Sequence, residues 1–229
     1  KLSEQKWPIE FQEIVKKLSD SKPLSLEDGI FLFESKDLDT IGYLANLVKT
    51  ARFGNRAFFN VNVHINQTNI CTLACKFCAF RRGRRADDAY QMEIEEYIDD
   101  LRNYSSFVDE VHSVGGLHPE WDLEYYCELF ERVRHEFPKI HIKALTAVEI
   151  KHIAKLSNLS IHQTLSRLKQ SGLGSLPGGG AEILVDEVRN DISPKKGSPN
   201  NWLRVMEEAQ TLGLTTSATN VFGFGESIQ

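Results

Sequence analysis

Residues 1–56 carry apolar side chains at the spacing of short helices. An apolar set recurs three and four positions apart, as on one helix face, at Phe11, Ile14, Val15 and Leu18. Ser25 and Asp28 have the form of a capping box ahead of a second apolar stretch. A third stripe, from Ile41 to Val48, ends near Gly54. We therefore predict an N-terminal helical extension over residues 1–56.

From residue 58 the pattern changes to strict alternation, which is typical of a strand. The apolar members are Phe59, Val61, Val63 and Ile65, and the polar members are Asn60, Asn62, His64 and Asn66. Further strands are predicted within 107–114, 140–146, 173–176 and 215–222. Helical patterns separate them: one apolar face begins after Glu120, 146–170 forms one or two helices, and 201–211 forms another. Strands that alternate with helices predict a parallel sheet or barrel.

The predicted fold class is α/β, a parallel (β/α) barrel of TIM-barrel-like type that is partial here. A closed eight-stranded barrel needs roughly 250 residues, whereas residues 57–229 provide five strands. We therefore assign 57–229 to the barrel, with its C-terminal strands missing. The sequence begins at Lys1 rather than methionine and stops at Gln229 after a glycine-rich turn. Both features predict a piece of a longer protein.

The polar side chains of the first strand are predicted to face the inside of the barrel. In a barrel ringed by helices, outward side chains pack against helices and inward ones line the lumen. Asn62 and His64 would then point inward, as would His141 and Lys143 of the third strand. A polar lumen indicates a binding cavity; the alternative is a half-exposed edge strand with a solvated polar face.

The composition describes a globular protein without a nucleic-acid or membrane-binding surface. The chain is 41% hydrophobic and 26% charged, with a net charge of −5, which does not favour anionic partners. No apolar run approaches the roughly 18 residues of a membrane span, and the N-terminus does not resemble a secretory signal. Three of the four cysteines lie within eight residues, which is no disulfide scaffold. We expect a reduced, cytoplasmic protein.

The clustered cysteines are the strongest chemical signal in the chain. Cys71, Cys75 and Cys78 have the spacing Cys-x3-Cys-x2-Cys directly after the first strand, where barrel active sites lie. Three thiolates can ligate three irons of a [4Fe–4S] cluster, leaving the fourth iron free to chelate a small molecule. The alternative is a structural zinc site, which needs four protein ligands. Cys127 lies on the apolar face of its own helix and is most simply a core residue.

This cysteine motif resembles that of the radical S-adenosylmethionine (SAM) enzymes, and other features fall where that superfamily has them. Phe77 is the aromatic residue before the third cysteine. Gly115 and Gly116 end the second strand, where these enzymes place backbone against the methionine amino group. The segment 221–226, which starts at Val221, is similar to the fifth-strand motif beside the adenine.

The flanking segments resemble the menaquinone and deazaflavin branch of the superfamily. These are 78–80, 114–119, 141–150 and 175–183. Ala-Leu-Thr-Ala-Val-Glu-Ile and Ser-Leu-Pro-Gly-Gly-Gly-Ala-Glu are most similar to aminofutalosine synthases, over a resemblance that runs from about residue 20 to the end. One position departs: the branch commonly has Tyr-Gly-His after the fifth strand, whereas this chain has Phe222-Gly223-Phe224.

The resemblance implies a [4Fe–4S] cluster, SAM as co-substrate and a one-electron reductant such as flavodoxin or ferredoxin. The 5′-deoxyadenosyl radical would add to the enol-ether double bond of 3-[(1-carboxyvinyl)oxy]benzoate. Loss of the carboxylate as bicarbonate would then give aminodeoxyfutalosine. The alternatives are a hydrogen-abstracting relative, such as dehypoxanthine futalosine cyclase or the deazaflavin (FO) synthase subunit, and an inactive iron–sulfur or zinc-binding remnant.

Several side chains are candidates for holding SAM. Thr146, at the end of the third strand, is a candidate for SAM contact. Glu182 follows the triple-glycine loop and is predicted to bind a ribose hydroxyl; the alternative is a first-turn glutamate that favours the helix dipole. Arg189 is predicted to meet the methionine carboxylate, with a surface position as the alternative. Val221 is predicted to lie beside the adenine.

The substrate candidates lie after the cluster loop and on the inner face. Arg81 and Arg82 form a cationic rim suited to a dicarboxylate, since an arginine fork matches carboxylate geometry; the alternative is a solvated charged loop. Asn62 is a further substrate contact. His64 and His118 are predicted catalytic or substrate-binding residues, with turn stabilisation as the alternative for His118.

Overall fold

The computed structural model describes residues 5–228, which form two compact units. One unit extends to Phe59 and includes residues from Gly225 onward, and the other runs from Asn60 to Phe224. Among the described residues no helix is both long enough and apolar enough to cross a bilayer.

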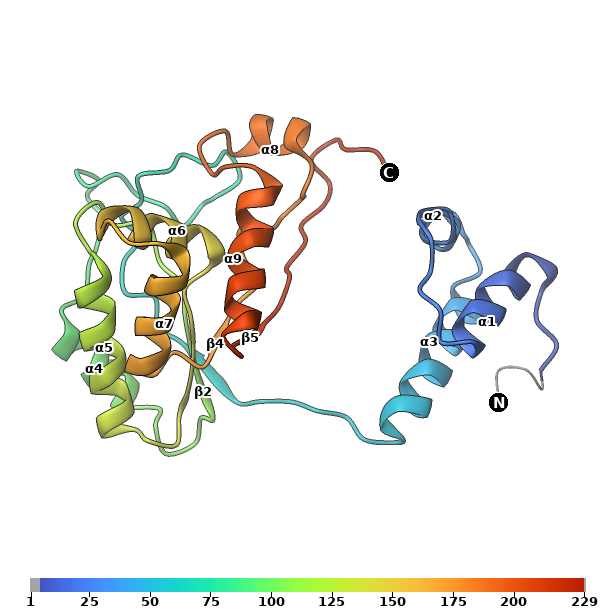
Figure 1. Ribbon diagram of the computed structural model, residues 1–229, viewed down its shortest axis with the longest axis horizontal. Helices are drawn as coiled ribbons and strands as arrows, with labels where there is room; N and C mark the ends of the chain where they lie inside the picture. The colour runs from blue at the N-terminus through green and yellow to red at the C-terminus, as the bar shows by residue number, and fades with distance from the viewer. Residues whose placement is uncertain (1–4, 229) are drawn as a thin grey trace. The chain divides into compact units, whose positions relative to one another are not determined.

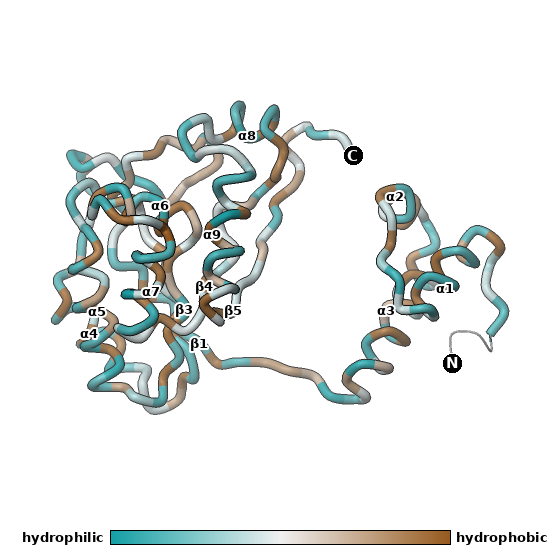
Figure 2. Tube along the Cα trace, viewed as in Figure 1, coloured by the Kyte–Doolittle hydropathy of each residue, from teal (hydrophilic) through white to brown (hydrophobic). Residues whose placement is uncertain are grey.

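The N-terminal unit is helical, as the apolar spacing predicts. It contains a 3₁₀ helix η2 (Ile9–Phe11), α1 (Gln12–Ser19), α2 (Leu26–Glu34) and α3 (Leu38–Phe53). The capping box of Ser25 and Asp28 is present at α2, and Gly54 caps the end of α3. Hydrophobic positions recur along α1 and α3 in Figure 2, and Phe11, Val15 and Leu44 form the small buried core.

The second unit is a parallel five-stranded sheet with helices between the strands (Figure 1). The strands, in sheet order, are β1 (Asn62–His64), β2 (Glu110–Ser113), β3 (His141–Ala144), β4 (Ser175–Leu176) and β5 (Thr215–Thr216). The helices are α4 (Ile94–Arg102), α5 (Leu123–Glu136), α6 (Ala147–Leu156), α7 (Ile161–Ser171), α8 (Asp186–Ile192) and α9 (Pro199–Thr211). All five predicted strands are confirmed, each shorter than expected.

The strand register separates an apolar face from a polar face. Val63, Val111 and Ile142 are paired neighbours that face the helices, and Val111 is fully buried. On the opposite face, pairing aligns His64 with His112 and His112 with Lys143. The predicted separation of the two faces is therefore confirmed. Asn62 and His64 are exposed on the edge strand β1, so a closed polar lumen stays a prediction; we call the polar face of the sheet its inner face.

The expected start of the first strand is wrong, and one helix was not predicted. Phe59 is 89% exposed and Val61 39% exposed, because β1 pairs with β2 only from Asn62 onward. The sequence analysis did not predict the helix α4, although Glu93 and Glu96 form a capping box at its start. The stretch 146–170 forms two helices, with a new capping box at Ser160 opening the second.

We expect the two faces of β3 to respond differently to truncation. Ile142→Ala should lower the free energy of unfolding by about 2–5 kcal/mol, because it leaves a cavity against the helices. Lys143→Ala, one position further and on the inner face, should change it by no more than about 0.5 kcal/mol. Denaturant unfolding of both variants measures the difference, and equal destabilisation would contradict the assigned facing.

Candidate active site

The cysteine loop is tied by its backbone to three separate parts of the chain. The amide of Cys71 donates to the Arg82 carbonyl (3.0 Å), and the amide of Thr72 donates to the Leu117 carbonyl beyond β2 (3.1 Å). The amide of Lys76 donates to the Ile192 carbonyl at the end of α8 (2.8 Å). The loop is therefore fixed at the carboxyl edge of the sheet by neighbours on both sides.

The three thiols of this loop interact with one another. Cys71, Cys75 and Cys78 are all half-buried. Burial raises the pKa of the Cys75 thiol, charge repulsion from Cys71 and Cys78 raises it further, and the ammonium of Lys196 opposes both. Cys127 is buried in the helical core, as predicted. The donor set near the loop is thus three thiols without a fourth, which fits three irons of a [4Fe–4S] cluster.

A structural zinc site gains no support from the geometry. Within residues 5–228, no group of three histidine, cysteine or acidic side chains converges closely enough to hold one metal ion. A cubane presents its irons at different corners, so its thiolate ligands stand farther apart than the ligands of a single ion. The absence of a converging group therefore does not argue against the cluster, for which the sequence has the Cys-x3-Cys-x2-Cys spacing.

Gly115 and Gly116 allow the end of β2 to pack directly on the segment that leads into the cysteine loop. A Cβ at Gly116 would overlap the Ile70 carbonyl, and one at Gly115 would lie 2.7 Å from Gln67 Nε2. The amide of Gly116 donates to the Thr68 carbonyl (2.9 Å). The absence of side chains thus lets backbone approach backbone beside the cluster loop.

Glu149 is a buried carboxylate that sequence analysis did not single out. Its Oε1 accepts the Gly115 amide (2.9 Å), and its Oε2 accepts both the amide and the hydroxyl of Thr146 (2.7 Å each). Burial raises its pKa to about 7, against an ordinary value of 4.5. One side chain therefore joins the end of β2 to the start of α6. Thr146 is the N-cap of α6, so its hydroxyl is already engaged in the cap.

The triple-glycine loop packs against neighbouring elements at close range. A Cβ at Gly179 would lie 2.9 Å from the Thr146 methyl, and Gly180 has a left-handed φ of +85°. The Trp202 indole of α9 donates to the Gly179 carbonyl (3.2 Å). These contacts place the residue after the loop, Glu182, at the same edge of the sheet.

Glu182 and Arg189 form a buried group beside the cysteine loop. Glu182 has a strained φ of +41° and accepts the Gly180 amide (3.1 Å). It precedes α8 by several residues, so the alternative of a first-turn glutamate is wrong. Arg189 is 2% exposed, so its alternative of a surface position is also wrong. Its Nε and Nη1 donate to four backbone carbonyls, those of Gly180, Ala181, Ile183 and Gly197, which leaves Nη2 outside these bonds.

Residues after β5 reach the same group. The amide of Val221 donates to the Glu182 carbonyl (3.2 Å). Phe224 contacts Phe77 of the cysteine loop, with ring centroids 5.4 Å apart. Lys196 lies 5.0 Å from the Phe77 ring centroid and 3.0 Å from Glu182 Oε2. Sequence analysis missed Lys196, because nothing in its local pattern marks it. Phe224, where the branch commonly has histidine, thus packs on the loop that carries the cysteines.

The arginines after the loop differ in how their guanidinium groups are used. Arg82 donates to Asp88 (2.6 Å) and to three carbonyls of its own loop, so it braces the turn after the cysteines. Arg81 is partly buried, and its Nε makes no hydrogen bond within the described residues. A substrate role is compatible with Arg81 and stays a prediction for both.

His118 lies in a stabilised turn. Its Nε2 is 3.1 Å from Gln91 Oε1, and its Nδ1 accepts the Glu120 amide (3.3 Å). The ring is stacked on Trp121 at 4.2 Å, and burial lowers its pKa. This geometry is that of the turn-stabilising alternative, and the catalytic role stays a prediction. Asn62 and His64, by contrast, are exposed on the inner face of β1.

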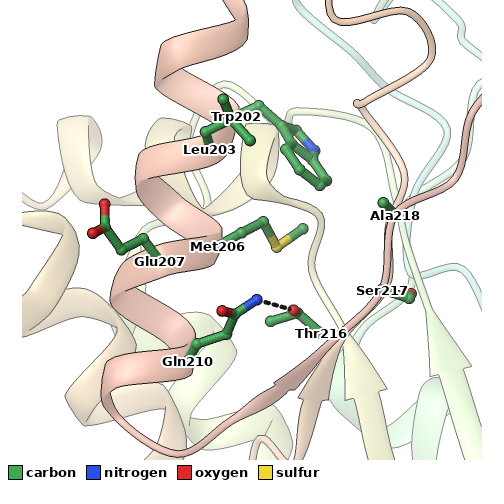
Figure 3. Close-up of a pocket in the computed structure, with 8 residues that line it drawn as sticks. All are labelled: Trp202, Leu203, Met206, Glu207, Gln210, Thr216, Ser217 and Ala218. Atoms are coloured by element: carbon green, nitrogen blue, oxygen red, sulfur yellow. Dashed lines mark hydrogen bonds between the residues drawn. The ribbon is translucent and has the colours of Figure 1, made fainter. Parts of the chain in front are cut away.

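A large pocket lies away from these residues. A hollow of about 520 Å³ opens between α9 and the end of the sheet, lined by Trp202, Leu203, Met206, Glu207, Gln210, Thr216, Ser217 and Ala218. Figure 3 shows the hydrogen bond from Gln210 to Thr216 across it (2.9 Å). None of its lining residues belongs to the predicted site. A small pocket of about 50 Å³ does adjoin the cysteine loop, between Cys75 and Lys196.

Comparisons with known proteins identify the family of this chain. The model of the radical SAM superfamily matches residues 65–229. Aminodeoxyfutalosine synthase of Thermus thermophilus is 37% identical over 217 residues, which cover 94% of this chain and 58% of that enzyme. Cyclic dehypoxanthine futalosine synthase of Halalkalibacterium halodurans is 32% identical over 221 residues, 94% of this chain and 59% of that enzyme.

The solved structure of the FeFe-hydrogenase maturase HydG of Carboxydothermus hydrogenoformans shares the fold. Its TM-score is 0.72 at 22% identity, and the match covers 96% of this chain and 50% of that one. The chain belongs to the radical SAM superfamily, whose members use a [4Fe–4S] cluster and S-adenosylmethionine. It spans a little over half the length of the curated relatives it matches.

The buried carboxyl of Glu149 predicts a pH dependence of stability. Because its pKa is raised in the folded chain, the folded state holds the proton more tightly than the unfolded state. The wild type should therefore lose stability as pH rises from about 4.5 to about 7, by about 3 kcal/mol relative to a residue without charge.

Glu149→Gln is the matched variant, because it keeps the size of the side chain without the charge. Between pH 5 and pH 8 the free energy of unfolding of the wild type should fall relative to that of the variant. Urea unfolding at several pH values measures it. A difference that stays constant over this range would show that Glu149 does not titrate as described.

Proposed function

We propose that the protein containing this chain is an aminodeoxyfutalosine synthase, which adds the adenosyl group of SAM to an enol-ether benzoate. The observation that carries the proposal is the identity of 37% and 38% to the aminodeoxyfutalosine synthases of Thermus thermophilus and Streptomyces coelicolor, each over more than nine tenths of this chain. The substrate would be 3-[(1-carboxyvinyl)oxy]benzoate, which would react with SAM and water to give 6-amino-6-deoxyfutalosine, methionine and bicarbonate.

In this proposal Cys71, Cys75 and Cys78 would hold the cluster, which would supply one electron to SAM. Glu182, with one carboxylate oxygen on the Gly180 amide, would take a ribose hydroxyl. Arg189 would present Nη2 to the methionine carboxylate. The strained backbone of Glu182 supports such a role, since strained residues cluster at ligand sites.

The remaining residues would place the substrate and exclude water. The inner face of the sheet adjoins the cysteine loop at the carboxyl edge, where a bound double bond can lie close to the adenosyl carbon. The aromatic pair of Phe77 and Phe224 would shield the loop from solvent. Neither aromatic ring donates or accepts a proton, so proton transfer would fall to other residues.

A hydrogen-abstracting reaction is the second candidate. The cyclic dehypoxanthine futalosine synthases are 32% identical over a similar share of the chain. In such a reaction SAM would yield free 5′-deoxyadenosine rather than an adenosylated product. The two candidates therefore differ in the product that carries the adenosyl group: the adenosylated benzoate product in one reaction, and free 5′-deoxyadenosine in the other.

One anaerobic reaction, analysed by mass spectrometry, separates them. The full-length protein with its cluster reconstituted and reduced is incubated with SAM and the enol-ether benzoate. We expect a product that carries the adenosyl group and has lost one carboxylate. Free 5′-deoxyadenosine beside unchanged benzoate would reject the synthase and favour hydrogen abstraction. A Cys75→Ser variant is the control, and it should form neither product.

A further inference from the structure

Three nitrogen-bearing side chains form one row across the inner face of the sheet. The register pairs His64 with His112 and His112 with Lys143, so the three side chains leave neighbouring strands on the same side. The rings of His64 and His112 are in contact, with centroids 4.3 Å apart. The row therefore spans β1, β2 and β3 just below the edge that carries the cysteine loop.

No carboxylate in the described part of the chain forms an ion pair with the positive charge of the row. Within residues 5–228 no ion pair or side-chain hydrogen bond involves His64, His112 or Lys143. The half-buried Lys143 has no carboxylate partner among these described residues, and a buried cation without a partner is unfavourable unless a ligand supplies the anion. Glu110 and His141 lie on the same face, one row toward the amino ends of the strands. Glu110 is buried, its Oε1 has no hydrogen-bond partner, and it makes no ion pair with Lys143 among the described residues.

The electrostatics at His112 agree with an excess of positive charge. Burial, and to a smaller extent the charges of His64 and Lys143, together lower the pKa of His112 to about 4. His112 is therefore neutral near pH 7 and can donate or accept a hydrogen bond, while the positive charge of the row comes from the Lys143 side chain. A cation flanked by imidazoles matches a carboxylate, which accepts several charge-assisted hydrogen bonds.

We propose that His64, His112 and Lys143 together form the binding row for a carboxylate of the substrate. The inference rests on the proposed function, in which the substrate is an aromatic dicarboxylate, and it assigns Lys143 and His112 as binding residues. Lys143 supplies the charge, and the imidazoles fix the orientation of the carboxylate. A substrate held there has its other end toward the cysteine loop.

Binding of isophthalate tests the row without turnover. This stable aromatic dicarboxylate is titrated by calorimetry into the full-length, cluster-loaded protein. Lys143→Met should bind it at least about tenfold more weakly than the wild type, because a charge-assisted bond is lost. Lys143→Arg should retain most of the affinity. Lys139→Met, which removes an exposed lysine just before β3, is the matched control and should bind as the wild type does.

His112→Asn is a second variant, for the case that Lys143→Met folds poorly, and it should weaken binding several-fold. Wild-type affinity in both Lys143→Met and His112→Asn would overturn the proposal, as would a wild type that does not bind isophthalate. If the row binds isophthalate as expected but the enol-ether benzoate is not adenosylated, the carboxylate row stands and the proposed reaction fails. The two failures are therefore distinguishable.

Discussion

The parallel register of the five strands is the constraint on which the site depends. Because all strands run in one direction, their carboxyl ends and the loops that follow them meet at a single edge. The parallel direction of the strands brings four segments to this edge: the cysteine loop after β1, the glycine pair after β2, Thr146 after β3 and Glu182 after β4. An antiparallel arrangement of the same strands would divide them between two edges.

Close backbone packing then fixes the loops that the register brings together. Gly116 packs against Ile70, and the triple-glycine loop packs against Thr146 and Trp202. Two buried charged side chains complete the framework. Glu149 joins β2 to α6 because its carboxylate accepts three hydrogen bonds. Arg189 donates hydrogen bonds to four backbone carbonyls near the cysteine loop.

Much of this arrangement can be predicted from local sequence patterns. The alternation from residue 60 to residue 66 predicts the facing of β1, and the cysteine spacing predicts the cluster loop. The facing of His112 could not be predicted in the same way, because both faces of its predicted strand carry apolar residues. Val108 and Val114 lie on the same face as His112, and Val111 lies on the opposite face. Glu149 and Lys196 were missed because their partners lie far along the chain; Gly115, for example, is 34 residues from Glu149.

The central claim is that three cysteines hold a cluster whose fourth iron is open to SAM. Electron paramagnetic resonance of the reduced, cluster-loaded full-length protein, recorded with and without SAM, tests this claim most directly. If the fourth iron takes up the amino and carboxylate groups of SAM, the g values of the cluster signal should change on its addition. Superimposable spectra at saturating SAM would contradict the account.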